Sequence, residues 1–205
     1  MIAYGSRICF DMEVLMREEK KLYSEKIAEK ISDDKEEQEI LQYGLHQGFT
    51  ILLNLVTLIV CGILWNELSL MLFLFLGIFF LRPYAGGYHA DTELRCYFIS
   101  AAIMNIAVWA KRSFILSDVV LAGIWIGTAV IIWRYAPVEN PIHPLDESER
   151  KKYAKNTKKI LLCNGMIVLA GIGTQQKFWG EIIVWVQILT VIAMVAGLLK
   201  YKEKS

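Results

Sequence analysis

A cysteine and a histidine lie seven positions apart in a polar segment between two apolar stretches of the chain. Cys96 supplies a thiol that can act as a nucleophile, and His89 supplies an imidazole that can take up the thiol proton. On one straight helix the two would lie about 10.5 Å apart along the axis, too far for a hydrogen bond. A catalytic pair therefore requires the chain to fold back near His89, with the next helix beginning after it. The alternative is an interfacial histidine and a small buried cysteine.

The residues around this pair allow such a fold. Pro83 is predicted to end the preceding helix, because proline breaks the helical hydrogen-bond ladder. The pair Gly86-Gly87 permits positive φ angles and a close approach of the backbone to another group. Asp91 or Thr92 can then cap a helix that carries Cys96 near its N-terminal end, where the helix dipole stabilises negative charge.

Charged and apolar residues are segregated along the 205-residue chain, of which 55% is hydrophobic and 21% charged. Residues 1–40 carry eighteen charged side chains, whereas residues 49–81 carry only Glu67. This pattern excludes a soluble globular protein, a disordered chain and a nucleic-acid-binding protein. We therefore predict an all-α, polytopic integral membrane protein, a single membrane domain over residues 1–205 that contacts the lipid bilayer and no nucleic acid.

Six apolar stretches are candidates to cross the bilayer as helices, which takes about 20 residues each. They cover residues 45–65, 68–82, 96–110, 113–133, 160–176 and 182–199. The first two meet in a tight hairpin at Asn66-Glu67. With both termini in the cytoplasm, 19 of the 22 basic residues fall on the cytoplasmic side, as the distribution of Lys and Arg in membrane proteins requires. A re-entrant segment or a four-span arrangement is the alternative.

The two long polar segments have their own predicted structures. Residues 1–40 alternate acidic and basic side chains around isolated apolar ones, which predicts a cytoplasmic amphipathic helix ahead of a six-helix bundle over residues 41–200. In residues 134–159 prolines prevent a regular helix in the first half, and the second half is strongly basic. The basic half anchors the topology, or it binds an acidic peptide segment or anionic headgroups.

The other thiols and the amides within the spans are predicted to be structural. Cys61 and Cys163 fall inside apolar stretches, where cysteine behaves as a small hydrophobic residue. Four amides within the spans should face other helices rather than lipid. They would form hydrogen bonds between helices or line the path of a peptide: Asn54, Asn105, Asn164 and Gln187.

The segment from Arg82 to Ala90, RPYAGGYHA, followed by Cys96, resembles the signature of the accessory gene regulator B (AgrB) family. The similarity extends to Gln42–Leu45 (QYGL) ahead of the first apolar stretch and to Tyr135–Glu139 (YAPVE) ahead of the basic segment. It covers roughly residues 25–200, and we carry no role onto the first twenty residues. The family consists of membrane peptidases that process quorum-sensing propeptides in Gram-positive bacteria.

The resemblance implies a multi-pass cysteine endopeptidase of the bacterial cell membrane, with its active site near the cytoplasmic face. Cys96 would be the nucleophile and His89 its base. The substrate would be an AgrD-type propeptide, cleaved before its acidic tail through a thioester on Cys96 and then cyclised to a thiolactone or lactone signalling peptide. A homodimer is also implied.

Five further residues would support this chemistry. Arg82 would bind the acidic tail or the oxyanion, since its fork of donors suits a carboxylate. Backbone N–H groups of Gly86, Gly87 or the following helix start would form an oxyanion hole. Asp91 and Glu93 are candidates to orient the histidine. The structural alternatives are that Arg82 anchors the topology and that the glycines form a simple turn.

Two other functions are compatible with the sequence. The first is a non-enzymatic membrane peptide exporter or receptor, although the spans lack the paired charges at the midplane that are typical of transporters. The second is a metalloprotein with His89 and Cys96 as ligands. Because zinc needs three or four ligands and only carboxylates lie near these two residues, we expect neither a metal nor another cofactor.

Overall fold

The computed structural model describes residues 26–27, 31, 34–88, 93–114, 116–139 and 145–202. These residues form helices and one isolated β-bridge, which confirms the predicted all-helical fold for this part of the chain. The helices are α2 (Lys35–Leu64), α3 (Leu68–Ala85), α4 (Glu93–Ser113), α5 (Asp118–Tyr135), α6 (Glu147–Gly173) and α7 (Lys177–Lys202). Because residues 1–25 lie outside the described residues, the N-terminal amphipathic helix stays a prediction.

Among the described helices, three are long and apolar enough to cross a membrane: α3, α5 and α7. In α2 the apolar section is shorter, Gly48–Leu64. Large apolar side chains point outward along this section: Phe49, Leu52, Val56, Val60 and Ile63. An exposed apolar face of this extent is typical of a surface that contacts lipid or a partner. A crossing by all six helices and the orientation of the termini stay predictions.

The connection between α2 and α3 is the tight hairpin predicted at Asn66-Glu67, and three residues separate the two helices. Asn66 has a φ of 55°, a left-handed conformation that asparagine tolerates better than most residues. The Glu67 N–H donates to the Gly62 carbonyl, 2.8 Å away. This bond closes the turn and lets α3 return directly along α2.

The end of α3 differs from the prediction, because the helix continues past Pro83 to Ala85. The expectation that Pro83 ends this helix is therefore wrong. Near a helix end a proline removes a single backbone hydrogen bond, and its fixed φ is itself helical. Gly86 ends the helix instead: its φ of 73° is left-handed, and its N–H donates to the Arg82 carbonyl at 2.9 Å.

Two helices extend further into the polar segments than their apolar stretches indicate. α2 begins at Lys35, inside the charged N-terminal segment, and α6 begins at Glu147, so the basic half of residues 134–159 is helical. The irregular first half is confirmed where it is described, since it connects α5 to α6. The Glu149 carboxylate accepts from the Asp146 N–H at 3.2 Å and caps α6.

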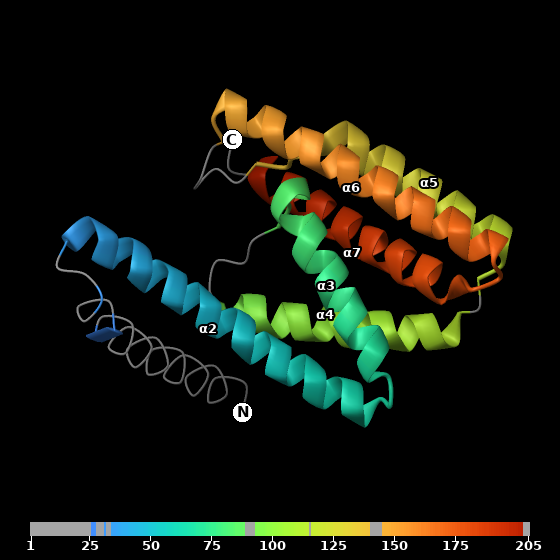
Figure 1. Ribbon diagram of the computed structural model, residues 1–205, viewed down its shortest axis with the longest axis horizontal. Helices are drawn as coiled ribbons and strands as arrows, with labels where there is room; N and C mark the ends of the chain where they lie inside the picture. The colour runs from blue at the N-terminus through green and yellow to red at the C-terminus, as the bar shows by residue number, and fades with distance from the viewer. Residues whose placement is uncertain are drawn as a thin grey trace.

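Helices α5, α6 and α7 pack side by side, and α3 packs across α6 and α7 (Figure 1). α2 contacts α3 and α4, and its N-terminal half extends away from the other helices. The side chains that α3 and α7 contribute to the core are fully buried, among them Leu70, Met71, Leu74 and Met194. Because α3 has neighbours on both sides, packing fixes its C-terminal end, which carries Arg82 and the two glycines.

Two of the four amides predicted to face other helices, Gln187 and Asn105, make polar contacts outside their own helix. Gln187 on α7 is fully buried, and the Thr128 hydroxyl on α5 donates to its Oε1, 2.7 Å away. Asn105 on α4 accepts from Trp65 Nε1 at 2.8 Å. The Asn54 amide bonds within its own helix, to the Thr50 carbonyl.

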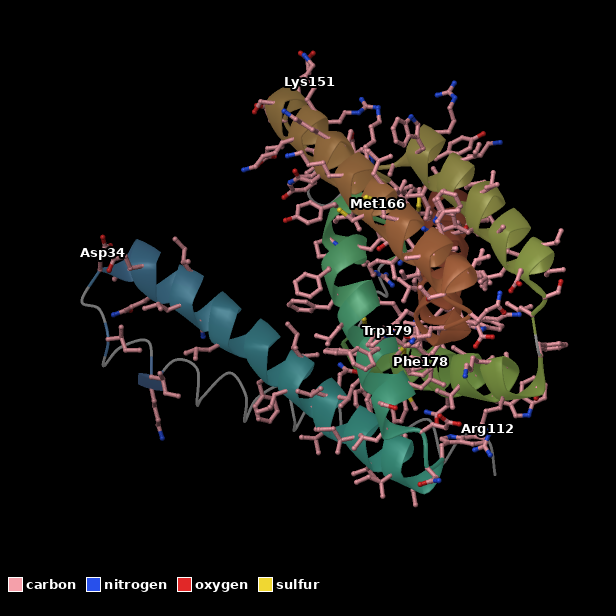
Figure 2. The ribbon with its side chains drawn as sticks, turned by 45° about the vertical axis from the view of Figure 1, so that its right-hand side comes forward. Asp34, Arg112, Lys151, Met166, Phe178 and Trp179 are labelled. Carbon is pink, nitrogen blue, oxygen red and sulfur yellow. The ribbon has the colours of Figure 1, made fainter. Side chains whose placement is uncertain are left out.

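Ion pairs join the helices at the end of the bundle opposite to the C-terminal end of α3. They are Lys111 with Glu181 at 3.5 Å, Arg112 with Glu67 at 4.0 Å and Lys177 with Asp118 at 2.6 Å. Arg112 and Phe178 lie far from Lys151, which marks the other end (Figure 2). The hairpin of α2 and α3 and the starts of α5 and α7 therefore meet at one end, and the glycines lie at the other.

Gly165→Leu is expected to lower the thermal stability of the protein by roughly 5 °C. A Cβ at Gly165 would lie 2.5 Å from Cζ2 of Trp125, where α6 packs on α5. Overpacking such a contact costs about 1–3 kcal/mol. Thermal unfolding of the protein in detergent measures the shift. Gly127→Leu is the matched control, because a Cβ there meets nothing within 4 Å, and an equal shift in both variants would contradict the prediction.

Candidate active site

The two glycines after α3 adopt backbone conformations that other residues rarely take. Gly86 has a φ of 73° and Gly87 a φ of 131°. Both values lie in the region where a Cβ collides with the backbone, so the turn uses the positive φ angles that the two glycines permit. The turn leads the chain from the end of α3 directly into Tyr88 and His89.

One side of the turn is covered by the segment between α5 and α6. The Val138 N–H donates to the Ala85 carbonyl at 2.9 Å, and Gly86 and Val138 form an isolated parallel bridge. A Cβ on Gly86 would lie 2.1 Å from the Val138 carbonyl oxygen. The Tyr135–Glu139 segment, which the sequence resemblance includes, therefore packs against the glycine turn, and only glycine fits at position 86.

The other side of the turn is covered by the C-terminal part of α7. The Tyr88 N–H donates to the Ala193 carbonyl at 2.7 Å. A Cβ on Gly87 would lie 2.9 Å from the Ala193 oxygen, and a Cβ on Gly197 would lie 2.8 Å from the Gly87 carbonyl carbon. The backbones of the turn and of α7 are thus in direct contact.

Two side chains from the last turn of α7 also reach this segment. The Tyr201 hydroxyl donates to the Gly87 carbonyl at 3.4 Å, and Lys200 Nζ lies 4.8 Å from the centroid of the Tyr88 ring. These contacts were not predicted from the sequence. The spacing of Ala193 and Gly197 is a signal that was available, since two small residues four apart let a helix backbone approach another chain closely.

Arg82 lies on the last turn of α3 and is partly buried. Its Nη2 donates to the Tyr88 carbonyl, so the guanidinium turns back over the glycine turn. It is also within electrostatic range of the Cys96 thiol and the Tyr201 hydroxyl. The residue therefore holds the backbone that precedes His89.

Cys96 is the fourth residue of α4 and carries an exposed, free thiol. The described part of α4 starts at Glu93, and residues 89–92, where the chain would have to fold back to pair His89 with Cys96, lie outside the described residues. The next side chain fixes the start of this helix, because the Tyr97 hydroxyl lies 2.6 Å from Thr57 Oγ1 on α2. The thiol is thus held near the positive end of a helix and open to a substrate.

Three of the predicted site side chains cannot be compared with this geometry. His89 and Asp91 lie outside the described residues, and so does the side chain of Glu93. The His89–Cys96 pair and the orienting roles of the two carboxylates stay predictions. Within the described ranges, no three His, Cys, Asp or Glu side chains group closely enough to hold a metal ion.

The Gly86 N–H, one of the predicted oxyanion donors, is already bonded to the Arg82 carbonyl. The first-turn N–H groups of α4 have no carbonyl partner within the helix, as at every helix start, and they lie next to Cys96 in the chain. An exposed thiol, a guanidinium and helix-start N–H groups are the kinds of group that enzymes use to attack a carbonyl and to stabilise the resulting negative charge.

Comparison with known proteins identifies the family. The model of the family described as accessory gene regulator B matches residues 21–194. A putative AgrB-like protein of Clostridium perfringens (strain SM101) is 30% identical over 150 residues, 69% of this chain and 70% of the relative. Protein FsrB of Enterococcus faecalis is 27% identical over 143 residues, 66% of this chain and 56% of the relative. No solved structure is a significant match. The chain belongs to the accessory gene regulator B family, as the RPYAGGYHA segment predicts.

Proposed function

We propose that the protein is a membrane-embedded cysteine endopeptidase that removes the acidic tail of an AgrD-type quorum-sensing propeptide and promotes its cyclisation. The observation that carries the proposal is the exposed, free Cys96 thiol near the start of α4. It follows the glycine turn, at which the Arg82 guanidinium donates to the Tyr88 carbonyl. An accessible thiol can be reached by a substrate, as a catalytic cysteine must be. Membership of the AgrB family supports a peptide as the substrate.

In the first step the Cys96 sulfur attacks the carbonyl carbon of the peptide bond that precedes the tail. His89 takes the thiol proton and then delivers it to the amine of the tail as the C–N bond breaks. The products are the free tail and a thioester between Cys96 and the remaining peptide. No oxidant, reductant or other co-reactant is needed.

In the second step a thiol or hydroxyl of the bound peptide attacks the thioester. The new bond closes a thiolactone or lactone ring as the bond to Cys96 breaks, and the Cys96 sulfur takes up the proton that the attacking thiol or hydroxyl gives up. When the attacking group is a thiol, one thioester replaces another, so the step is nearly isoenergetic. Hydrolysis would waste the intermediate, and a site at the membrane surface that excludes water favours cyclisation.

Arg82 has two roles in this scheme. Its positive charge would stabilise the negative charge that develops on the carbonyl oxygen during attack. The guanidinium has five N–H donors, and the bond to the Tyr88 carbonyl uses one of them, which leaves others for a carboxylate of the tail. The first-turn N–H groups of α4 or the backbone of Gly87 would complete the oxyanion hole.

In the proposed topology the chain crosses the membrane six times. Both termini and the active site lie on the cytoplasmic side. This topology is supported by the position of the connections: the glycine turn and the Tyr135–Glu139 segment share one end of the bundle, and the ion-paired connections lie at the other. The exposed basic residues of α6, such as Lys151, Lys152 and Lys155, lie at the same end as the site and would attract the acidic tail. Formation of a homodimer stays a prediction.

A trapped acyl-enzyme tests the proposal. The protein is co-expressed with a propeptide that has an amphipathic leader, one cysteine and an acidic tail, and with a variant of that peptide whose cysteine is alanine. The variant cannot close the ring, so the wild-type protein should gain the mass of the peptide without its tail. Hydroxylamine should remove this mass, because it cleaves thioesters. A whole, unattached peptide in both experiments would contradict the proposal and favour the exporter or receptor.

A further inference from the structure

We propose that Tyr201, in the last turn of α7, is a positioning residue for the chemistry of this site. The inference rests on the proposed function. Tyr201 acts on the backbone of Gly87 and Tyr88, which leads directly into His89. Tyr201 holds this backbone from a helix that supplies neither member of the Cys96–His89 pair.

Both backbone polar groups of Tyr88, the residue before His89, are hydrogen-bonded. The Tyr88 N–H donates to the Ala193 carbonyl on α7, and the Tyr88 carbonyl accepts from Arg82. The Lys200 ammonium lies over the face of the Tyr88 ring. The preceding carbonyl, that of Gly87, accepts from the Tyr201 hydroxyl. Two consecutive carbonyls are therefore fixed by two side chains from different helices, α3 and α7.

Tyr201 and Arg82 act on the same short segment and on each other. The two side chains are within electrostatic range, and Arg82 is in turn within range of Cys96. The Tyr201 ring packs against the main core, so its hydroxyl is held in place by α7. Loss of this hydroxyl frees the Gly87 carbonyl and removes one neighbour of the guanidinium, while the packing of the ring can be kept.

The contacts of α7 restrain the turn in both directions, toward α7 and away from it. Gly87 and Gly197 are already in backbone contact, so the turn cannot move closer to α7. Movement away from α7 is opposed by the Tyr88–Ala193 bond and by Tyr201 and Lys200. Gly197, Lys200 and Tyr201 lie beyond residue 194, where the match to the family model ends.

Because small misplacements of a reacting group slow a chemical step strongly, the effect should fall on the rate of acylation. Tyr201→Phe should lower the rate constant for acyl-enzyme formation about fivefold to tenfold, as expected for loss of one hydrogen bond. The concentration of propeptide at half-maximal rate should stay unchanged. Lys200→Met, which removes the cation over the Tyr88 ring, should lower the same rate constant about twofold to fivefold.

The test measures acyl-enzyme formation in a single turnover, with the full chain in vesicles and the propeptide variant that cannot cyclise. The final amount of adduct counts the folded, competent molecules, and the rate constant reports positioning. A merely structural role of Tyr201 would lower the amount and leave the rate constant unchanged. Tyr153→Phe is the matched control, because it removes the same hydroxyl from a ring that packs edge-on against Tyr84 at this end of the bundle.

A rate constant that falls in Tyr201→Phe and Lys200→Met at an unchanged amount of adduct, and not in Tyr153→Phe, supports the inference. Wild-type rate constants in both α7 variants, or an equal fall in Tyr153→Phe, would overturn it and leave the proposed function intact. A loss of adduct without a change in rate constant would also overturn it. A wild-type protein that forms no adduct would overturn the proposed function, and this inference with it.

Discussion

Cys96→Ala is expected to abolish release of the propeptide tail, by a factor of more than about 1000, and His89→Ala is expected to do the same. Alanine at position 96 removes the sulfur that would form the acyl-enzyme, and water at the membrane surface is a poor substitute. Alanine at position 89 leaves the thiol without a base. The measurement is the amount of free tail in membranes that contain equal amounts of wild-type or variant protein.

The other cysteines provide the control for this prediction. Cys163→Ala removes an exposed thiol from α6, and Cys61→Ala removes a partly buried one from α2. Both variants should release the tail at the wild-type rate, since neither thiol lies in the first turn of α4. Normal tail release by Cys96→Ala would rule out the thioester route. A loss in all three variants would point to a general effect of cysteine replacement on folding.

The helices were predictable from the sequence because apolar stretches and charges are segregated along it. The hairpin at Asn66-Glu67 is an example, since those residues are the only polar pair within residues 49–81. The ends of the helices were less predictable. α2 and α6 begin among charged residues, where hydropathy falls although the backbone hydrogen bonds of the helix continue. The predicted end of α3 at Pro83 was wrong for a related reason: one missing N–H near a helix end does not prevent the last turn from forming.

The candidate site was predictable only in its local part. The types and spacing of Arg82, Gly86, Gly87 and Cys96 are visible in the sequence, and the positive φ angles follow from the two glycines. What packs on them depends on tertiary structure. Val138 and Tyr201 contact the glycine turn but are far from it in the sequence. The spacing of the small residues Ala193 and Gly197 indicates that another segment can approach α7 closely, but it does not identify that segment.

Gly86→Ala is expected to lower tail release at least about 100-fold while the helices still form. Position 86 combines a φ of 73° with a ψ of −161°, a conformation essentially limited to glycine. The added Cβ would also lie 2.1 Å from the Val138 carbonyl oxygen. The turn and the Tyr135–Glu139 segment must therefore separate, which moves the residues that lead to His89. Tail release and the helical content of the purified protein measure the two effects separately.

Two alanine variants show whether this effect belongs to the turn. Gly123→Ala lies on α5, where a Cβ meets nothing within 4 Å, and it should leave tail release unchanged. Gly87→Ala should also lower tail release, because its φ is positive and its Cβ would lie 2.9 Å from the Ala193 oxygen. If Gly86→Ala retained wild-type activity, the contact with Val138 would not matter for the reaction. If Gly86→Ala and Gly87→Ala both lose activity with helical content intact, the reaction needs the native backbone of this turn, which the Val138 segment contacts on one side and α7 on the other.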